Sequence, residues 1–222
     1  MNQRWSIYAA LGAGGLCPRV EVIAPDLETA PAHKEFPPGG SVYALARSPK
    51  GTALAVGTKN GRAICYAPPD HEEGWEAERP LPHRFAPVLA MEFISETAVA
   101  VANAAGGCWL YDTGENQGSS NPLATCAQPI CALCAVNDHL LAGLAADGHI
   151  ALWDTRSLAV VGRWPGPPQF SCTALVTLTR LGESQKLLLS AANGEIATFD
   201  LSTEALQPAL AHAGKSYAII QG

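Results

Sequence analysis

The chain has 222 residues, of which 48% are hydrophobic and 15% are charged, so it can bury a large core and is not a globally disordered protein. Its formal net charge is −6, and its 14 Lys and Arg residues form no dense run, which argues against direct nucleic-acid binding. The 21 Gly and 17 Pro residues separate many short apolar runs, and this pattern predicts all-β structure.

Seven cysteines are present, and most lie within apolar runs such as residues 63–66, where a free cysteine behaves as a small buried hydrophobe. We therefore expect free thiols in a reducing compartment and predict that the protein is cytoplasmic. Glycines interrupt the apolar run at residues 5–16, so we expect no secretory signal. No apolar run reaches the ~18 residues of a membrane span, and we expect no membrane partner.

Short apolar segments recur along the chain with a regular period. Residues 5–11 and 19–24 are two such segments. After these segments, a three-residue pattern occurs five times: an apolar or small residue, alanine, and an aliphatic residue. Its alanines are 42–46 residues apart, which is the period of a four-stranded propeller blade; they are Ala44, Ala90, Ala132, Ala174 and Ala218.

A predicted hairpin follows each of the first four alanine motifs. The two halves of each hairpin are apolar, and the turns between them are Asn60-Gly61, Gly106-Gly107, Asp147-Gly148 and Asn193-Gly194. Asn-Gly and Asp-Gly are strong hairpin signals because these residues readily adopt positive φ. We therefore predict four strands in each unit. Strand a contains the alanine, strands b and c form the hairpin, and a more polar strand d follows. We expect strand d at residues 158–164 in one unit and near residues 123–126 in another.

The predicted c strands end in a recognisable motif. Residues 146–154 read Ala-Asp-Gly-His-Ile-Ala-Leu-Trp-Asp and resemble the end of a WD40 repeat, including its Trp153-Asp154 pair. Similar pairs with another aromatic residue are Tyr111-Asp112 and Phe199-Asp200. Residues 65–67 depart from the motif because they lack the aspartate. The Gly-His signature of the family is reduced to single histidines, which are His33, His83 and His212.

This resemblance implies an all-β fold, a WD40-like β-propeller formed by residues 1–222 as a single domain. Five four-stranded blades are expected. The N-terminal segments would supply strands b, c and d of one blade, and the motif at Ala218 would supply its missing strand a, so that the C-terminal strand closes the ring. The alternative is a partial ring that pairs with a second chain.

Three groups of residues could be interpreted as chemical sites, and each of them can also be explained by a structural role. The spacing of Cys126, Cys131 and Cys134 is found in iron–sulfur proteins, but two of them lie in a predicted inner strand, so we interpret them as core residues. The acidic residues within 70–78 are interpreted as a solvated loop. The resemblance implies that Asp112, Asp154 and Asp200 lie in separate blades and hold turns. We therefore expect no catalytic residue, metal or cofactor.

The function predicted from these features is a non-catalytic scaffold for protein–protein interaction, or a regulatory subunit of a larger complex. The alternative is a small propeller hydrolase or carbohydrate-binding protein, which would need several carboxylates at the centre of the ring. Among the expected inner strands, however, Glu92 is the only acid. A nucleic-acid-associated adaptor is the third interpretation, and the net charge of −6 argues against it.

In WD40-like rings, the face formed by the d–a and b–c connections is the usual contact surface. We therefore predict that this face binds one or more protein partners through exposed aromatic and basic residues, which are types enriched at binding hot spots. The predicted contact residues are Lys59, Arg84, Phe85, Gln169, Phe170 and Lys215.

Overall fold

The computed structural model describes residues 7–11, 19–23, 32–35, 42–66, 79–82, 86–114, 120–123, 125–166, 177–180, 186–190 and 195–211. All the regular secondary structure of these residues consists of β-strands, which confirms the predicted all-β class. The strands form five antiparallel sheets, of which four have four strands and one has three. No helix in the described part of the chain is long and apolar enough to cross a membrane.

The sheets follow one another in chain order. The three-stranded sheet contains β1 (Ile7–Leu11), β2 (Arg19–Ile23) and β3 (Ala32–Glu35). The second contains β4 (Val42–Arg47), β5 (Leu54–Thr58), β6 (Ala63–Tyr66) and β7 (Arg79–Leu81). The third contains β8 (Val88–Phe93), β9 (Ala98–Asn103), β10 (Cys108–Asp112) and β11 (Ser120–Leu123). The fourth contains β12 (Ile130–Ala135), β13 (Leu140–Ala145), β14 (Ile150–Asp154) and β15 (Ala159–Trp164). The fifth contains β16 (Thr177–Arg180), β17 (Lys186–Ser190), β18 (Glu195–Asp200) and β19 (Ala205–Ala211).

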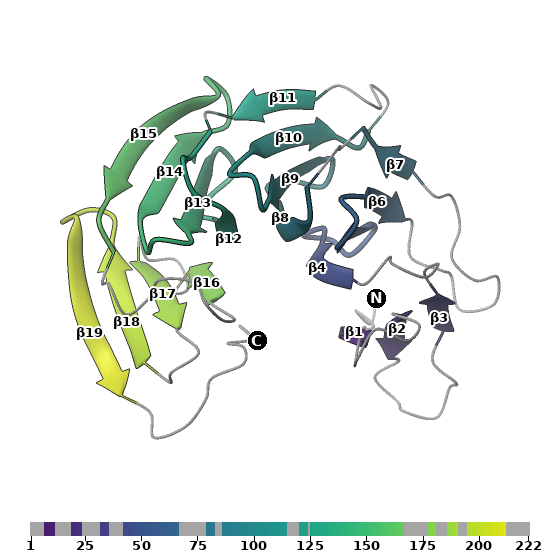
Figure 1. Cartoon of the computed structure of the whole chain (residues 1–222), viewed down its shortest axis with the longest axis horizontal. Helices are drawn as coiled ribbons and strands as arrows, with labels where there is room; N and C mark the ends of the chain where they lie inside the picture. Colours follow the sequence, from purple (N-terminus) through teal and green to yellow (C-terminus); the bar gives the residue numbers. More distant parts are fainter. Residues whose placement is uncertain are drawn as a thin grey trace.

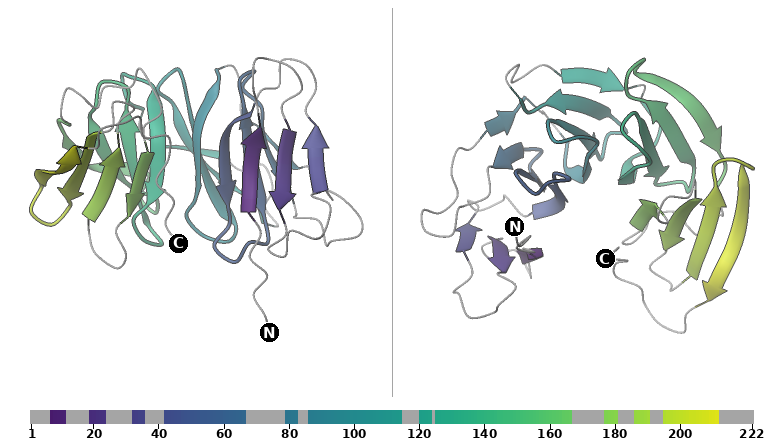
Figure 2. Two further views of the ribbon diagram at one scale, coloured as in Figure 1. Left: turned by 90° about the horizontal axis from the view of Figure 1, so that it is seen from below. Right: turned by 180° about the vertical axis from the view of Figure 1, so that it is seen from behind.

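The five sheets are arranged side by side around a centre, as the blades of a propeller are (Figure 1). The first strand of each four-stranded sheet lies innermost, and the fourth lies on the outer rim (Figure 1). The inner strands contact one another in series, β4 with β8, β8 with β12 and β12 with β16. The strands run roughly across the disc from one face to the other, so the connections gather on two opposite faces (Figure 2).

The three-stranded sheet lacks an inner strand among the described residues. Its β1 contacts β4, just as the second strands β5 and β9 contact the inner strands β8 and β12 of the sheets that follow them. β1 therefore occupies the position of a strand b, and β2 and β3 occupy the positions of strands c and d. This matches the strand roles expected for the N-terminal segments.

The alanine motif coincides with a β-bulge that recurs in three inner strands. The pairing register shifts between Val42 and Ala44, between Val88 and Ala90, and between Ile130 and Ala132, so one residue at the start of each strand is left out of the ladder. The three alanines that follow the shifts are at most 9% exposed. A small side chain at this position lets neighbouring inner strands approach closely. Ala174 and Ala218 lie outside the described residues, and the fifth sheet's inner strand is described over Thr177–Arg180.

Three of the four described hydrophobic clusters lie between neighbouring sheets, and the fourth is formed by side chains of the second sheet. The largest buried side chains are the aromatic residues near the ends of the third strands, which are at most 2% exposed; they are Tyr66, Tyr111, Trp153 and Phe199. The last three each share a buried cluster with side chains of the preceding sheet. The aromatic position of the repeat therefore joins one sheet to the next.

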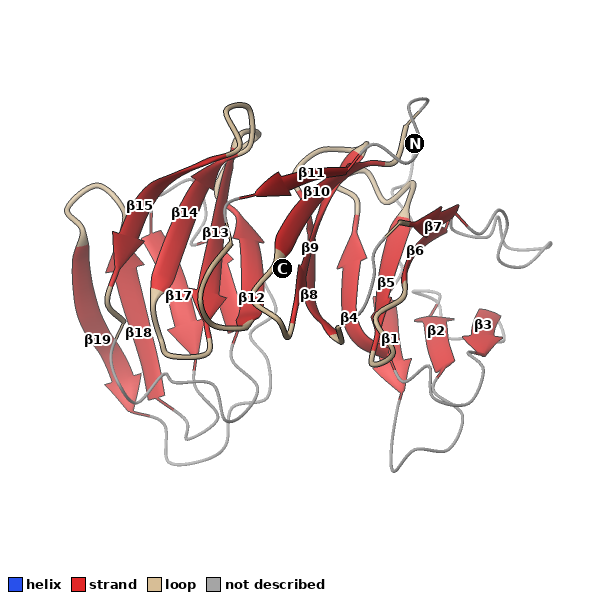
Figure 3. Cartoon of the chain, turned by 45° about the horizontal axis from the view of Figure 1, so that its top comes forward, coloured by secondary structure: helices blue, strands red, loops and turns tan. Residues whose placement is uncertain are grey.

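The outer strands form the rim of the disc (Figure 3). Prolines occur in three of them, at Pro80, Pro122 and Pro208. An outer strand tolerates proline because one of its edges has no ladder to complete. A strand d was expected near residues 123–126, and the structure has it about three residues earlier, as β11 (Ser120–Leu123). The bounds were wrong because a polar segment with a proline resembles a loop in sequence, yet Pro122 lies in the strand, opposite Trp109.

Candidate interaction face

Two sets of connections define the two faces of the disc. We call one the turn face; it is formed by the b–c turns and by the d–a connections that lead into the next sheet. The amide of Ala104 donates to the carbonyl of Pro87 at 2.9 Å, and the amide of Ala146 donates to the carbonyl of Pro129 at 2.7 Å. The same bond thus ties a b–c turn to the adjoining d–a connection in two successive sheets, and it holds this face in a regular arrangement.

The opposite face is formed by the a–b and c–d connections and carries the aspartates of the repeat. Oδ1 of Asp112 accepts from the Gly114 amide at 2.8 Å. Oδ1 of Asp154 accepts from the amides of Arg156 and Ser157 at 2.8 and 3.2 Å, and these bonds hold its pKa below the usual range. Asp200 bonds Ser202 and Thr203 in the same way. Each aspartate therefore orders its own turn in a separate sheet, and the three form no common acid site.

Of the six predicted contact residues, Lys59 is the one that the structure describes. It is exposed in the b–c turn of the second sheet, on the turn face. The other five lie outside the described residues and stay predictions; they are Arg84, Phe85, Gln169, Phe170 and Lys215. The acidic residues within 70–78 lie outside the described residues as well.

Charge is unevenly divided between the two faces. Among the described side chains of the turn face, the cations are Lys59, Arg62 and Arg163, and the acid is Asp147. None of the three cations is paired with a carboxylate of the described residues. Asp147 is engaged locally, because its Oδ1 accepts from the amide of His149 at 3.1 Å and lies 3.2 Å from His149 Nδ1. The turn face therefore offers positive charge in a chain whose net charge is −6.

The opposite face carries most of the described acids, and several are paired. Lys186 Nζ lies 3.8 Å from Asp200 Oδ2, and Arg156 Nη2 lies 3.4 Å from Asp138 Oδ2. The Glu96 carboxylate joins two sheets, since it accepts from Ser48 Oγ at 2.7 Å, from the Lys50 amide at 2.9 Å and from the hydroxyl of Thr52. These pairs engage part of the charge of this face, on which acids outnumber cations among the described residues.

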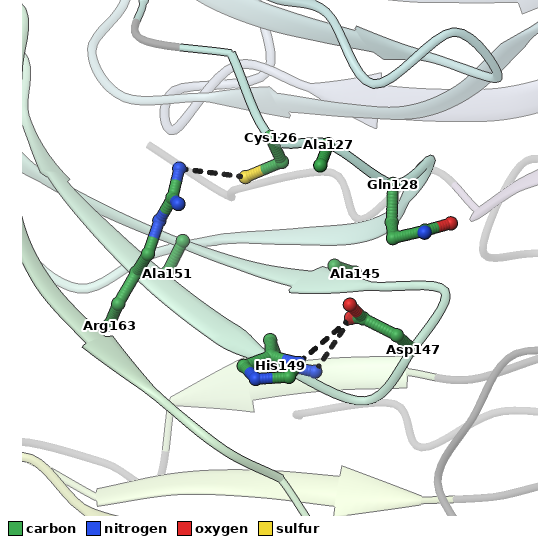
Figure 4. A pocket seen from close by; sticks show the side chains of 8 residues that line it. All are labelled: Cys126, Ala127, Gln128, Ala145, Asp147, His149, Ala151 and Arg163. Atoms are coloured by element: carbon green, nitrogen blue, oxygen red, sulfur yellow. Dashed lines mark hydrogen bonds and ion pairs between the residues drawn. The ribbon is translucent and has the colours of Figure 1, made fainter.

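A small cavity opens on the turn face between the third and fourth sheets (Figure 4). Its volume is about 150 Å³. Side chains from the β11–β12 connection, from the β13–β14 hairpin and from β15 surround it; they are Cys126, Ala127, Gln128, Ala145, Asp147, His149, Ala151 and Arg163. Sequence reasoning missed this cavity because its lining comes from three separate segments and contains no motif.

The three cysteines with iron–sulfur spacing do not form a cluster. Cys126 lines the cavity, whereas Cys131 and Cys134 belong to β12, and none of the three is in a disulfide. Burial raises the pKa of the Cys126 thiol, an effect that nearby Arg163 opposes, so the cavity holds a neutral thiol rather than a thiolate. Within the described residues, no group of three His, Cys, Asp or Glu side chains is placed to hold a metal ion.

Glu92 is the acid of the described inner strands. It lies on β8, and its Oε1 accepts from the amide of Ala135 on the neighbouring inner strand at 3.1 Å. Burial raises the pKa of Glu92 to about 7, although the bond from Ala135 acts in the opposite direction. This carboxylate therefore links two sheets and is poised to titrate near neutral pH.

Substituting Glu92→Gln is expected to remove a pH dependence of stability. Between pH 4.5 and about 7, the unfolded chain releases a proton that folded Glu92 retains, so the stability of the natural chain falls as pH rises through this window and is level above it. Glutamine keeps the acceptor for Ala135 and carries no charge. At pH 8 the variant should be more stable by about 3 kcal/mol. Urea titrations from pH 5 to pH 8 measure the effect, and parallel curves for the two proteins would refute this assignment.

Comparison with known proteins gives a consistent result for the fold. No protein-family model matches the chain. It is 26% identical over 147 residues to telomerase protein component 1 of Rattus norvegicus and 26% identical over 144 residues to the same protein of Mus musculus. These alignments cover 62% and 60% of the chain but 5% of each relative's length.

Among solved structures, the chain resembles the WD40 domain of Toxoplasma gondii coronin with a TM-score of 0.72 at 16% sequence identity. The match covers 94% of this chain and 57% of the coronin chain. The recurrent sheets, their order around a centre and this likeness together show that the chain has the WD40 β-propeller fold.

Proposed function

We propose that the chain is a non-catalytic interaction module, a scaffold or regulatory subunit of a larger complex, whose turn face docks an acidic or mixed-charge segment of a protein partner. The observation that carries this proposal is the charge of that face. Lys59, Arg62 and Arg163 have no carboxylate partner among the described residues, and the described acid of this face, Asp147, accepts a hydrogen bond from the His149 amide. Such complementarity steers association and selects partners.

Two further observations support a role in an assembly. The curated relatives are named as protein components of telomerase, and a component acts within a larger complex. None of the five described cysteines is in a disulfide, which is compatible with our proposal that the protein works in a reducing compartment such as the cytoplasm.

The alternatives have less support. A hydrolase or carbohydrate-binding propeller would gather several carboxylates at its centre, whereas Glu92 is the acid of the described inner strands, and its Oε1 already accepts a backbone hydrogen bond. A nucleic-acid adaptor would need a dense basic patch. The turn face offers three described cations spread over separate sheets.

Reversing charge on the turn face is expected to abolish capture of the partner. With the tagged chain as bait in a lysate, the double substitution Lys59→Glu and Arg62→Glu should reduce the captured partner at least tenfold, because an acidic segment would then be repelled. Both residues are exposed, so the melting temperature should stay near that of the natural chain. Quantitative mass spectrometry of the captured proteins measures the loss.

The matched control reverses two exposed cations of the opposite face, Lys50→Glu and Arg156→Glu. Among the described residues, Arg156 pairs with exposed Asp138, and such surface pairs contribute little to stability. The control should capture the partner normally. Equal loss in both variants would refute the choice of face, and loss on nuclease treatment would support the nucleic-acid adaptor instead.

We also propose that the ring is closed by the C-terminal segment of the same chain. The motif Tyr217-Ala218-Ile219 repeats the pattern found on the inner strands, and β1 occupies the second position of a sheet whose inner position is not filled by any described strand. Closure would make five four-stranded blades and hold the turn face rigid.

A further inference from the structure

The cavity of the turn face has an apolar floor of a defined size. Ala145 and Ala151, from the two strands of the β13–β14 hairpin, are buried and form this floor, and exposed Ala127 of the β11–β12 connection lines one side of the cavity (Figure 4). The volume of about 150 Å³ matches that of an apolar cavity that holds a benzene-sized group. This space therefore fits one aliphatic or phenyl-sized side chain.

Polar groups stand at the edge of this floor. Arg163 is exposed, and its Nη2 donates to the Thr125 carbonyl at 3.2 Å and lies 3.9 Å from Cys126 Sγ. The guanidinium has five N–H donors, so most of them stay available, and no carboxylate of the described residues pairs with it. Gln128 is exposed on another side of the cavity.

The contact with Thr125 also fixes where the cation lies. It places the guanidinium beside the β11–β12 connection, at the edge of the cavity, while the side chain stays exposed. Arginine is suited to bidentate recognition of a carboxylate, and a guanidinium already ordered by one bond loses less conformational entropy when it binds.

We infer that this cavity takes one aliphatic side chain from an extended partner segment, while an aspartate or glutamate next to it in that segment pairs with Arg163. The inference rests on the proposed function and gives the partner segment a sequence character, an apolar anchor flanked by acid. An apolar anchor in a small pocket with a polar rim is the arrangement found at binding hot spots. A carboxylate inserted on the alanine floor itself would lose its hydration without gaining a partner there.

Titration with short capped peptides tests the inference on the intact chain. The probe is acetyl-Glu-Leu-Glu-amide, and the signals are the ¹³C-labelled methyl groups of Ala127, Ala145 and Ala151. We expect these three methyls to shift together in a saturable way. Acetyl-Glu-Ser-Glu-amide, without the anchor, and acetyl-Lys-Leu-Lys-amide, with the charge reversed, should shift them at least tenfold less at equal concentration. Acetylglutamate, which has the carboxylates, and isovaleramide, which is neutral and has the isobutyl group, separate the two chemical groups, and each alone should bind more weakly than the peptide.

Two variants test the roles of the rim and of the cavity. Arg163→Gln should weaken binding of the acidic peptide about tenfold, as expected for loss of a charge-assisted hydrogen bond, and should leave the weak binding of acetyl-Gln-Leu-Gln-amide unchanged. Ala127→Leu places a side chain into the cavity from an exposed connection and should abolish binding of both peptides. Arg156→Gln on the opposite face is the matched control and should have no effect.

Each outcome decides the inference. Absence of shifts at the three methyls with millimolar peptide, or equal binding of the acidic and basic peptides, would overturn it. If the peptides fail while the Lys59 and Arg62 reversal still abolishes capture, the proposed function stands and the cavity is not its anchor point. If the peptides bind at the cavity while the Lys59 and Arg62 reversal has no effect on capture, the inference about the cavity holds, and the rest of the partner contacts other residues than Lys59 and Arg62.

Discussion

Replacing Trp153 with alanine is expected to lower the free energy of unfolding by about 3–5 kcal/mol. The indole is 0% exposed and belongs to a buried cluster that joins the third and fourth sheets. A β-carbon on Gly143 would come within 2.6 Å of the indole Cζ3, so the ring fills all the space that this glycine leaves. Removal of the indole would therefore leave a cavity between the third and fourth sheets.

Urea denaturation measured at one pH tests this value, with Asp154→Asn as the matched neighbour. The Asp154 side chain is partly exposed, and it orders a turn through bonds from the amides of Arg156 and Ser157. Asparagine keeps the Oδ1 acceptor, so the second variant should be clearly the more stable of the two. The opposite ranking would contradict the packing role of the indole.

Removing residues 214–222 is expected to cause aggregation or to lower the melting temperature by about 10 °C or more. If the segment fills the inner position beside β1, its loss exposes a sheet edge and uncovers apolar side chains. Burial of each isoleucine contributes about 1.5–3 kcal/mol, and each kcal/mol corresponds to about 2–4 °C in a domain of this size. Differential scanning fluorimetry measures the shift.

Light scattering on the same samples separates the two modes of closure. A closed single chain should be a monomer at full length. A full-length dimer that becomes a monomer on truncation would show that a second chain supplies the strand. A truncated protein that stays soluble with an unchanged melting temperature would contradict closure by this segment in either form.

Much of the fold could be predicted because each unit repeats local signals. The turn at Asp147-Gly148 and the aromatic residue of the Trp153-Asp154 pair each determine a feature within a few residues, and the structure has a hairpin and a buried ring there. The error at β11 arose because Pro122 and its neighbours look like a loop, and only the position at the rim makes them a strand.

The candidate site was predictable only in part, because its properties arise between sheets. Lys59 could be placed on the turn face from its position after strand b. The contact of Arg163 with Thr125, in contrast, joins residues 38 apart in sequence. The pKa of Glu92 depends on burial against an adjoining blade, which no local pattern reports.

The prolines of the rim have a consequence for how copies of the molecule meet one another. An outer strand with free amides and carbonyls is a template on which a strand of another chain can add and start aggregation. Pro80, Pro122 and Pro208 each remove an amide from such a strand, and β15, which has no proline, has its ladder interrupted by a register shift opposite Leu152 and Trp153. The rim is thereby made a poor surface for strand addition, and association is directed to the faces of the disc, where side chains rather than backbone decide which partner is accepted.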